Sequence, residues 1–326
     1  MLGERMLDSN IKALLDAGRE AGGPRLTEMG RDATRDMIRS LSGAGDSASP
    51  SDVETRDLAV GTGASASIPG RLYTPPKLSS PIGIVFYHGG GFTLGDLDTY
   101  DEFLRRLSTA SGLRVLAVEY RLAPEHPFPA GHEDALAAAD WALKHAPEIG
   151  FASDRIILVG DSAGGNLAAS VALAFRARGS DAIALQALLY PWLQFTDETA
   201  SLKENGDGYL LTRADLDKFA SDTFKAGSDR RDPRVAILAA EDLNGVAPAY
   251  IVTAGFDPLR DEGLAYAEKL RAASVAVETK HYPTMVHAFY MLTGVTPGAQ
   301  AGIDELGAAL RQHAVGALPE RATRTS

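Results

Sequence analysis

The sequence predicts an α/β fold in which a mainly parallel central sheet is flanked by helices and carries a helical cap. From about residue 82, continuous apolar runs alternate with helical patterns, which is typical of parallel strands buried on both faces. Residues 195–232 interrupt this alternation and contain no strand pattern. Because α/β sheets bind ligands at the carboxyl ends of their strands, we expect this insertion and the N-terminal helices to cover that edge.

The composition is that of a globular enzyme or binding protein. Of the 326 residues, 45% are hydrophobic and 23% are charged, and the net charge of -11 disfavours nucleic acid and anionic membranes as partners. The lack of cysteine excludes disulfides, thiolate metal sites and cysteine nucleophiles. The stretch MLGERMLDSNIKALLDAGRE carries charges where a signal peptide has its apolar core, and no run approaches the roughly 18 apolar residues that span a bilayer. We therefore expect a cytoplasmic protein.

The first part of the chain predicts helices and then a hairpin. Residues 5–42 have the pattern of two helices, separated at AGGPRLTEMG, and SGAGDSASPSD (42–52) has the composition of a linker. Two strand-like segments follow at 53–60 and 66–75. The Gly-Thr-Gly between them predicts that they pair antiparallel.

The remaining chain supplies the parallel sheet and its covering helices. Strands are expected at 82–87, 114–119, 155–159, 183–189, 249–254 and 275–282. Helices are expected near 97–111, 131–146, 163–178, 259–273 and 299–314, and the spacing of Thr212 and Asp215 predicts a capped helix start inside the insertion. The predicted domains are N-terminal cap helices (1–48), a first core part (49–194), a cap insertion (195–232) and a second core part (233–326).

Gly160-Asp161-Ser162-Ala163-Gly164 lies between a predicted strand and a predicted helix, as a nucleophile elbow requires. A residue forced into an unfavourable backbone conformation at a sharp turn crowds its neighbours, so the positions two before and two after it must be glycine. The Ser162 hydroxyl would then project at a helix N-terminus, whose partial positive charge favours a developing anion. The alternative is an ordinary turn with a helix-capping serine.

A glycine run, His88-Gly89-Gly90-Gly91-Phe92, directly follows an apolar strand. Ordering three glycines is entropically costly, and what they permit is the close approach of backbone N–H groups to a ligand oxygen. Acyl transfer needs such donors around the tetrahedral oxyanion. No Gly-Lys-Ser/Thr follows and no dinucleotide fingerprint is completed, so a phosphate-binding loop is excluded. His88 is expected to fix the loop by hydrogen bonds.

A nucleophilic serine needs an imidazole as base and an acid to orient it, which in this fold follow in the order Ser, acid, His. Asp257 ends one predicted strand and His287 lies in the loop after the next. Both therefore fall at the same sheet edge as Ser162. Asp257 before Pro258 is also a good helix N-cap, a role that can coexist with catalysis.

Other titratable residues are weaker candidates. Asp261 and Glu262 should lie inside a helix and point away from the edge. His281 falls in or at the end of a strand and His313 in the last helix. A metal site at His126, His132 and Glu133 has no recognised ligand spacing, so we expect no metal and no organic cofactor.

Several of these stretches together resemble one family, the bacterial hormone-sensitive-lipase-like (family IV) esterases of the α/β-hydrolase fold. The matching stretches are HGGGFTLGDLDTYDEF (88–103), YRLAPEHPFPAG (120–131), GDSAGGNLA (160–168) and DPLRDEG (257–263), with His287 in VHAFY. They cover most of the chain from about 80 to 290, and the GDSAGG form points to the subgroup of that name. The family usually has glycine after the catalytic histidine, where this chain has Ala288.

The resemblance implies a serine carboxylesterase that hydrolyses small-molecule, short-chain acyl esters. It implies Ser162 as nucleophile, Asp257 as acid and His287 as base. The backbone amides implied for the oxyanion hole are those of Gly89, Gly90 and Ala163. An amidase or lactonase could use the same apparatus, and a non-catalytic receptor on this fold would be expected to lack the histidine.

The resemblance also suggests roles for residues around the site. The candidate pocket residues are Phe92, Leu210 and Phe289. In the YRLAPEHPFPAG stretch, Arg121 and Glu125 are expected to form a structural ion pair. Similar enzymes often dimerise through the edge strand beside the catalytic histidine, so a homodimer is a further expectation.

Overall fold

One eight-stranded sheet organises the computed structural model, which describes residues 6–22, 28–29, 32–36, 50–61 and 67–316. The strand order is β1-β2-β4-β3-β5-β6-β7-β8. β1 pairs antiparallel with β2, and β2 antiparallel with β4, whereas every other neighbouring pair is parallel. The predicted hairpin and the mainly parallel sheet are thus both confirmed.

The strands begin and end close to the predicted positions. Their bounds are β1 Glu54–Gly61, β2 Ser67–Thr74, β3 Gly83–Tyr87, β4 Val115–Val118, β5 Ile156–Asp161, β6 Ile183–Leu189, β7 Ala249–Phe256 and β8 Val277–Val286. All residues of β3, β5 and β7 are buried, as expected for parallel strands covered on both faces. Successive β5 residues alternate between two hydrophobic clusters, with Ile156 and Leu158 in one and Ile157 and Val159 in the other.

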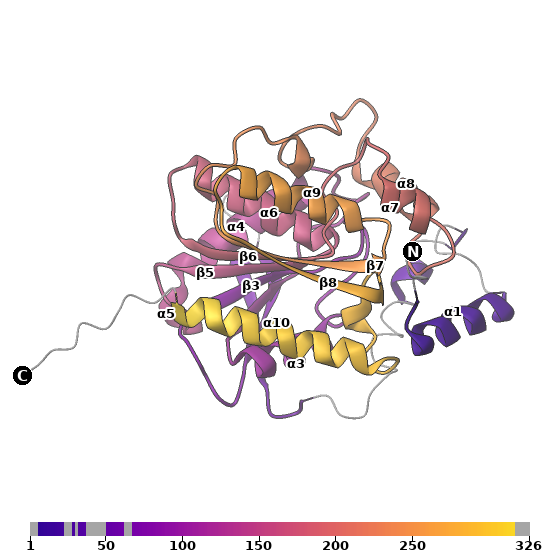
Figure 1. Ribbon diagram of the computed structural model, residues 1–326. Coiled ribbons are helices and arrows are strands. Elements are labelled where there is room, and N and C mark those ends of the chain that lie inside the picture. The colour runs from indigo at the N-terminus through magenta and orange to yellow at the C-terminus, as the bar shows by residue number, and fades with distance from the viewer. Residues whose placement is uncertain (1–5, 23–27, 30–31, 37–49, 62–66, 317–326) are drawn as a thin grey trace, which may run out of the picture.

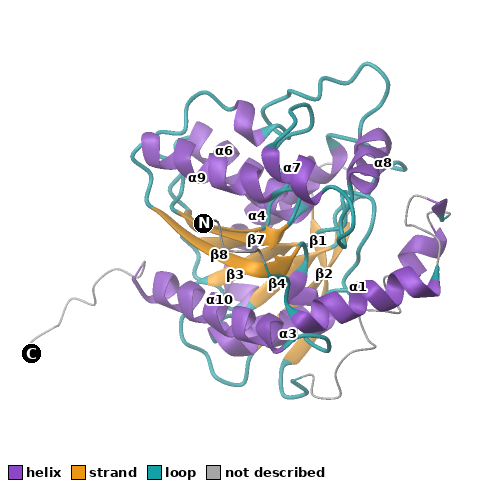
Figure 2. Ribbon diagram, turned by 45° about the vertical axis from the view of Figure 1, so that its right-hand side comes forward, coloured by secondary structure: helices purple, strands orange, loops and turns teal. Residues whose placement is uncertain are grey.

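Helices form a layer on each face of this sheet (Figures 1 and 2). Their bounds are α1 Ser9–Ala21, α3 Asp101–Ser111, α4 Ala130–Lys144, α5 Ala146–Ile149, α6 Ala163–Ala177, α7 Ala200–Asn205, α8 Arg213–Thr223, α9 Arg260–Ala272 and α10 Pro297–Gly316. α4, α6 and α9 cover one face, and α3 and α10 cover the other (Figure 1). None of the helices in the described ranges is long and apolar enough to cross a membrane.

The insertion between β6 and β7 contains two short helices, α7 and α8. α8 begins with the predicted capping box, in which Thr212 and Asp215 exchange side-chain and backbone hydrogen bonds. α1 reaches this insertion through Arg19, whose Nη2 donates to the Gly208 carbonyl at 2.6 Å. Residues 32–36 form a further helical turn, whereas most of the predicted linker 42–52 and of the hairpin turn lies outside the described residues.

Candidate active site

The tight turn between β5 and α6 holds Ser162 in a strained backbone conformation, with φ 54° and ψ -118°. The turn is so tight that a Cβ on Gly160 would lie 2.1 Å from the Gly164 carbonyl oxygen. A Cβ on Gly164 would lie 1.9 Å from the Tyr87 carbonyl oxygen. Both contacts are with backbone that cannot move aside, which explains why the sequence has glycine at both positions.

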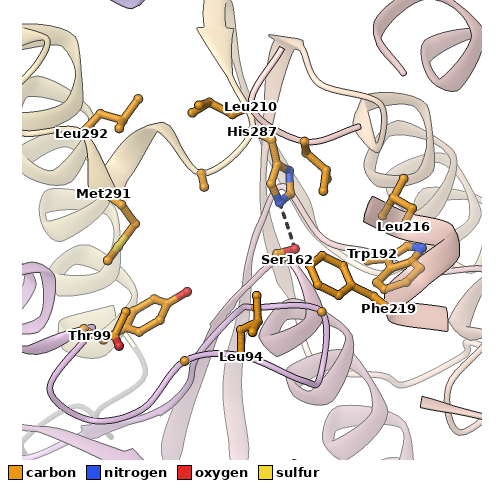
Figure 3. A pocket seen from close by; sticks show the side chains of 16 residues that line it. Leu94, Thr99, Ser162, Trp192, Leu210, Leu216, Phe219, His287, Met291 and Leu292 are labelled. Atoms are coloured by element: carbon orange, nitrogen blue, oxygen red, sulfur yellow. Dashed lines mark hydrogen bonds between the residues drawn. The ribbon is translucent and has the colours of Figure 1, made fainter. Parts of the chain in front are cut away.

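Ser162, His287 and Asp257 form a hydrogen-bonded row. His287 Nε2 lies 2.9 Å from Ser162 Oγ (Figure 3), and His287 Nδ1 lies 2.9 Å from Asp257 Oδ2. An imidazole protonated on Nδ1 donates to Asp257 and accepts from the serine hydroxyl, which is the arrangement a general base needs. Ser162 and His287 are 8% and 7% exposed, and Asp257 is fully buried.

The sheet places these three side chains at one edge, because β5, β7 and β8 are parallel and the three residues follow or end them. Asp257 Oδ1 also accepts from the Leu259 amide at 2.8 Å, so the carboxylate orients the start of α9 as well as His287. After His287 the chain turns through Ala288 at φ 59°. The turn requires a left-handed backbone conformation at this position, which glycine adopts most easily.

The glycine loop places two backbone amides at the cavity beside Ser162. Gly90 and Gly91 line this cavity, and their amides, like that of Ala163, donate to no acceptor in the part of the chain that the structure describes. The Gly89 amide, by contrast, donates to Asp161 Oδ1 at 2.7 Å. The expectation that Gly89 contributes to the oxyanion hole is therefore corrected: its donor is engaged, and Gly91 offers one instead.

The Asp161 carboxylate anchors the glycine loop by hydrogen bonding. It is buried and accepts from Gly89 N–H and from the Tyr100 hydroxyl at 3.0 Å. Burial raises the pKa of Asp161 to about 6, although both hydrogen bonds oppose the shift. Asp161 therefore couples the nucleophile turn directly to the loop that faces it.

His88 fixes the same loop, as predicted for it. Its Nδ1 lies 2.8 Å from the Gly89 carbonyl oxygen, and its ring stacks on Tyr120 with centroids 4.3 Å apart. Burial lowers the pKa of His88 to about 4, so the ring is neutral at pH 7 and Nδ1 can carry the donated proton.

The cavity above Ser162 has a volume of about 280 Å³ and an apolar lining. Met291, Leu292 and Thr99 lie on one side of the serine, and Trp192, Leu216 and Phe219 lie on the other (Figure 3). Leu216 and Phe219 come from α8, so the insertion forms part of the wall.

Of the three predicted pocket residues, Leu210 lines the cavity and two do not. Phe92 adopts φ 62° and is buried, with its ring 5.5 Å from that of His132. Phe289 is fully buried against Tyr290 and Tyr282. The expectation for Phe92 and Phe289 is corrected, because both rings pack into the hydrophobic core beside the site.

The rival acids and histidines have other partners. Asp261 accepts from the Ser201 amide, and Glu262 is buried and accepts from the Leu193 and Gln194 amides. His281 Nδ1 lies 2.9 Å from Thr253 Oγ1. Within the described ranges, no group of three His, Asp or Glu side chains is arranged to hold a metal ion.

The ion pair predicted between Arg121 and Glu125 is wrong. Arg121 forms a forked pair with Asp134, through Nε to Oδ2 and Nη2 to Oδ1, both at 2.8 Å. Glu125 instead accepts from Arg35 of the N-terminal segment. Asp134, on α4, is favoured over Glu125 because it also accepts a third hydrogen bond, from the Arg121 backbone amide at 2.9 Å.

A buried Asp–His–Ser row beside backbone amides defines a serine hydrolase. Comparison with known proteins agrees: the α/β-hydrolase fold family matches residues 84–291. The carboxylic ester hydrolase LipN of Mycobacterium tuberculosis is 46% identical over 267 residues, covering 80% of this chain and 71% of that one. An ethyl acetate hydrolase of Pseudomonas putida is 36% identical over 261 residues, covering 79% and 82%.

Solved structures of esterases are similar over nearly the whole chain. A thermostable esterase from Pseudomonas putida superposes with a TM-score of 0.90 at 31% identity, covering 95% of this chain and 98% of that one. An ester hydrolase from the metagenome of Lake Arreo gives a TM-score of 0.90 at 35% identity, covering 94% and 99%. The chain belongs to the hormone-sensitive-lipase-like carboxylesterases of the α/β-hydrolase fold.

Proposed function

We propose that the protein hydrolyses short-chain carboxylic esters through an acyl-enzyme formed on Ser162. The observation that carries the proposal is the row Ser162–His287–Asp257, which opens onto an apolar cavity beside unengaged backbone amides. Ser162 Oγ attacks the ester carbonyl carbon while its proton passes to His287 Nε2. Asp257 holds the imidazole and stabilises the imidazolium that forms.

The developing oxyanion accepts hydrogen bonds from the amides of Gly90, Gly91 and Ala163. The bond to the alcohol oxygen then breaks as His287 donates its proton to that oxygen. Water, deprotonated by the same histidine, attacks the acyl carbon, and the carboxylic acid leaves as Ser162 regains its proton. The strained turn supports this role, since it aims the hydroxyl away from the helix backbone, with no capping hydrogen bond.

The size and lining of the cavity support a small apolar substrate. Its volume of about 280 Å³ is just below the range of typical ligand pockets, which span roughly 300–1,000 Å³. We take α1, α7 and α8 as the cap (1–48 with 195–232), because Leu210, Leu216 and Phe219 of the insertion line the cavity and Arg19 of α1 donates to the Gly208 carbonyl of the insertion. The homodimer and the cytoplasmic location stay predictions.

Hydrolysis of nitrophenyl butyrate and nitrophenyl palmitate by wild type and Ser162→Ala tests this function. We expect fast turnover of butyrate, little of palmitate, and a loss on the order of 10⁴-fold or more in kcat for the variant. Ser170→Ala, on the same helix α6 but outside the cavity, should retain full activity. Equal activity of Ser162→Ala and wild type would refute the assignment of the nucleophile, and equal rates on both esters would refute the short-chain preference.

A further inference from the structure

Arg35, in the N-terminal segment, reaches the glycine loop. Its Nε and Nη2 both donate to the Thr93 carbonyl oxygen, at 2.9 and 2.8 Å. The same guanidinium pairs with both carboxylate oxygens of Glu125, Nη1 with Oε1 at 3.1 Å and Nη2 with Oε2 at 3.2 Å. The Arg35 side chain is 23% exposed, so water competes only partly for these contacts.

These contacts join three segments that are far apart in the sequence. Arg35 belongs to the helical turn 32–36, Thr93 to the loop that follows β3, and Glu125 to the loop between β4 and α4. A planar guanidinium can hold a carbonyl and a carboxylate at once in one geometry, which a lysine ammonium cannot do. The Ala123 amide adds a contact between the same two loops, donating to the Phe92 carbonyl at 2.9 Å.

Thr93 closes the turn that orients one of the oxyanion donors. Its amide and that of Leu94 both donate to the Gly90 carbonyl, at 3.0 and 2.9 Å. In a trans peptide the C=O and the following N–H point in opposite directions, so these bonds aim the Gly91 N–H the other way. In the same manner, His88 Nδ1 holds the Gly89 carbonyl and so orients the Gly90 N–H. The direction of the Gly91 donor thus depends on where residues 93 and 94 are held, whereas His88 sets the direction of the Gly90 donor.

We propose that Arg35, held by Glu125, is a positioning residue that fixes the Thr93 carbonyl and thereby the Gly91 amide for transition-state binding. This inference rests on the proposed ester hydrolysis and adds a role for the N-terminal segment beyond covering the cavity. Arg35 itself touches none of the reacting atoms. Loss of the guanidinium hydrogen bonds to Thr93 and Glu125 leaves the cavity lining in place but lets the turn 90–94 rotate.

The test compares Arg35→Met, Arg35→Lys and Glu125→Gln in the full chain, with Lys12→Met as a matched control. Lys12 is an exposed cation of α1 that pairs with Asp16 and does not contact the glycine loop. The readouts are kcat and KM for nitrophenyl butyrate, the melting temperature, and the Ki of a butyl trifluoromethyl ketone. That ketone forms an alkoxide on Ser162 and therefore needs the oxyanion donors.

For Arg35→Met we expect kcat to fall about 10- to 100-fold, with KM within about twofold of wild type and Ki rising in step with the loss of kcat/KM. Arg35→Lys should fall between wild type and Arg35→Met, because it keeps the charge but not the fork. Glu125→Gln should show the same pattern with a smaller loss of kcat. A double variant that combines Arg35→Met with Glu125→Gln should have no lower kcat than Arg35→Met alone.

A result in which Arg35→Met matches Lys12→Met would overturn the proposal. A loss of kcat without a change in Ki would also overturn it. So would a loss of kcat that is fully explained by a smaller fraction of folded protein. If Arg35→Met does not fold, the order of kcat and Ki among wild type, Arg35→Lys and Glu125→Gln decides the question. Failure of the proposed function would appear differently, as inactivity of the folded wild type or full activity of Ser162→Ala.

Discussion

The nucleophile turn (residues 160–165) and the glycine loop (residues 88–94) face each other across the active site but are held by different means. The turn is shaped by close backbone contacts: Gly160 packs on the Gly164 carbonyl, and Gly164 packs on the Tyr87 carbonyl at the end of β3. The loop is shaped by side chains from elsewhere, including Asp161 on Gly89 and Arg35 on Thr93. Backbone packing against β3 thus distinguishes the turn, whereas side chains from distant segments hold the loop by hydrogen bonds.

This difference sets how each half responds to mutation. A backbone–backbone contact cannot relax, so an added methyl group in the turn should disrupt the fold. A loop held by hydrogen bonds should lose little stability when one anchor is removed. Its backbone amides should lose their alignment, however, and the reaction rate should therefore fall. Three substitutions test this contrast, from the largest expected effect to the smallest.

Gly164→Ala should be the most damaging of these substitutions. Its Cβ would lie 1.9 Å from the Tyr87 carbonyl oxygen and 2.6 Å from that of His88, so α6 would have to move away from β3. We expect destabilisation of about 4 kcal/mol or more, measured by chemical unfolding, together with loss of activity. Gly18→Ala on α1, where a Cβ meets nothing within 4 Å, should be neutral or slightly stabilising. A folded, active Gly164→Ala would contradict the steric account of the turn.

Asp161→Asn tests the residue that joins the two halves. Because burial raises the pKa of Asp161 to about 6, the folded state keeps a proton that the unfolded chain releases near the ordinary aspartate pKa of 3.8. The free energy of unfolding of wild type, relative to Asp161→Asn, should therefore fall by about 2 kcal/mol as pH rises from 4 to 7.

Urea unfolding at several pH values across this window measures the effect. Asp57→Asn is a suitable control, because Arg71 lowers the pKa of Asp57, so ionisation of this carboxylate does not destabilise the folded state as pH rises. Parallel profiles for wild type and Asp161→Asn would show that burial does not destabilise the ionised Asp161 carboxylate. A wild type that gains stability relative to Asp161→Asn as pH rises would show the same.

Gly91→Ala should have the mildest effect, one that a second substitution can relieve. A Cβ there would lie 2.4 Å from the Phe219 ring, a side chain of α8 that can be truncated, and the residue has φ +61°. We expect a fall of about 10-fold in kcat/KM, part of which Phe219→Ala should restore. The same second substitution should not rescue Gly160→Ala, whose clash is with backbone. A double-mutant cycle without coupling between positions 91 and 219 would argue against this contact.

Much of the site could be predicted from the sequence, because its signals act over short distances along the chain. Gly160 and Gly164 flank Ser162 by two residues each, and the steric reason for them is local. Asp257 follows β7 and His287 follows β8, and the edge at which parallel strands end is common to both. The alternation of apolar runs and helices likewise predicted the sheet and its two covering layers.

The errors fall where several similar residues competed for one role. Gly89, Gly90 and Gly91 are identical in sequence, and it is the Asp161 carboxylate that occupies the first amide and leaves the other two. Phe92 follows the glycines directly, yet its positive φ directs the ring into the core.

The sequence by itself therefore determined the sheet, the covering helices and the order of Ser162, Asp257 and His287, since apolar periodicity and local sterics depend on neighbours a few residues away. Only the tertiary structure decided which amides stay unengaged and which aromatic rings line the cavity. It also decided that Glu125 pairs with Arg35, 90 residues away in the chain, rather than with the nearby Arg121. The physical reason is that a hydrogen bond or ion pair forms with whichever partner the fold brings within about 3 Å, and that distance is set by how the elements pack.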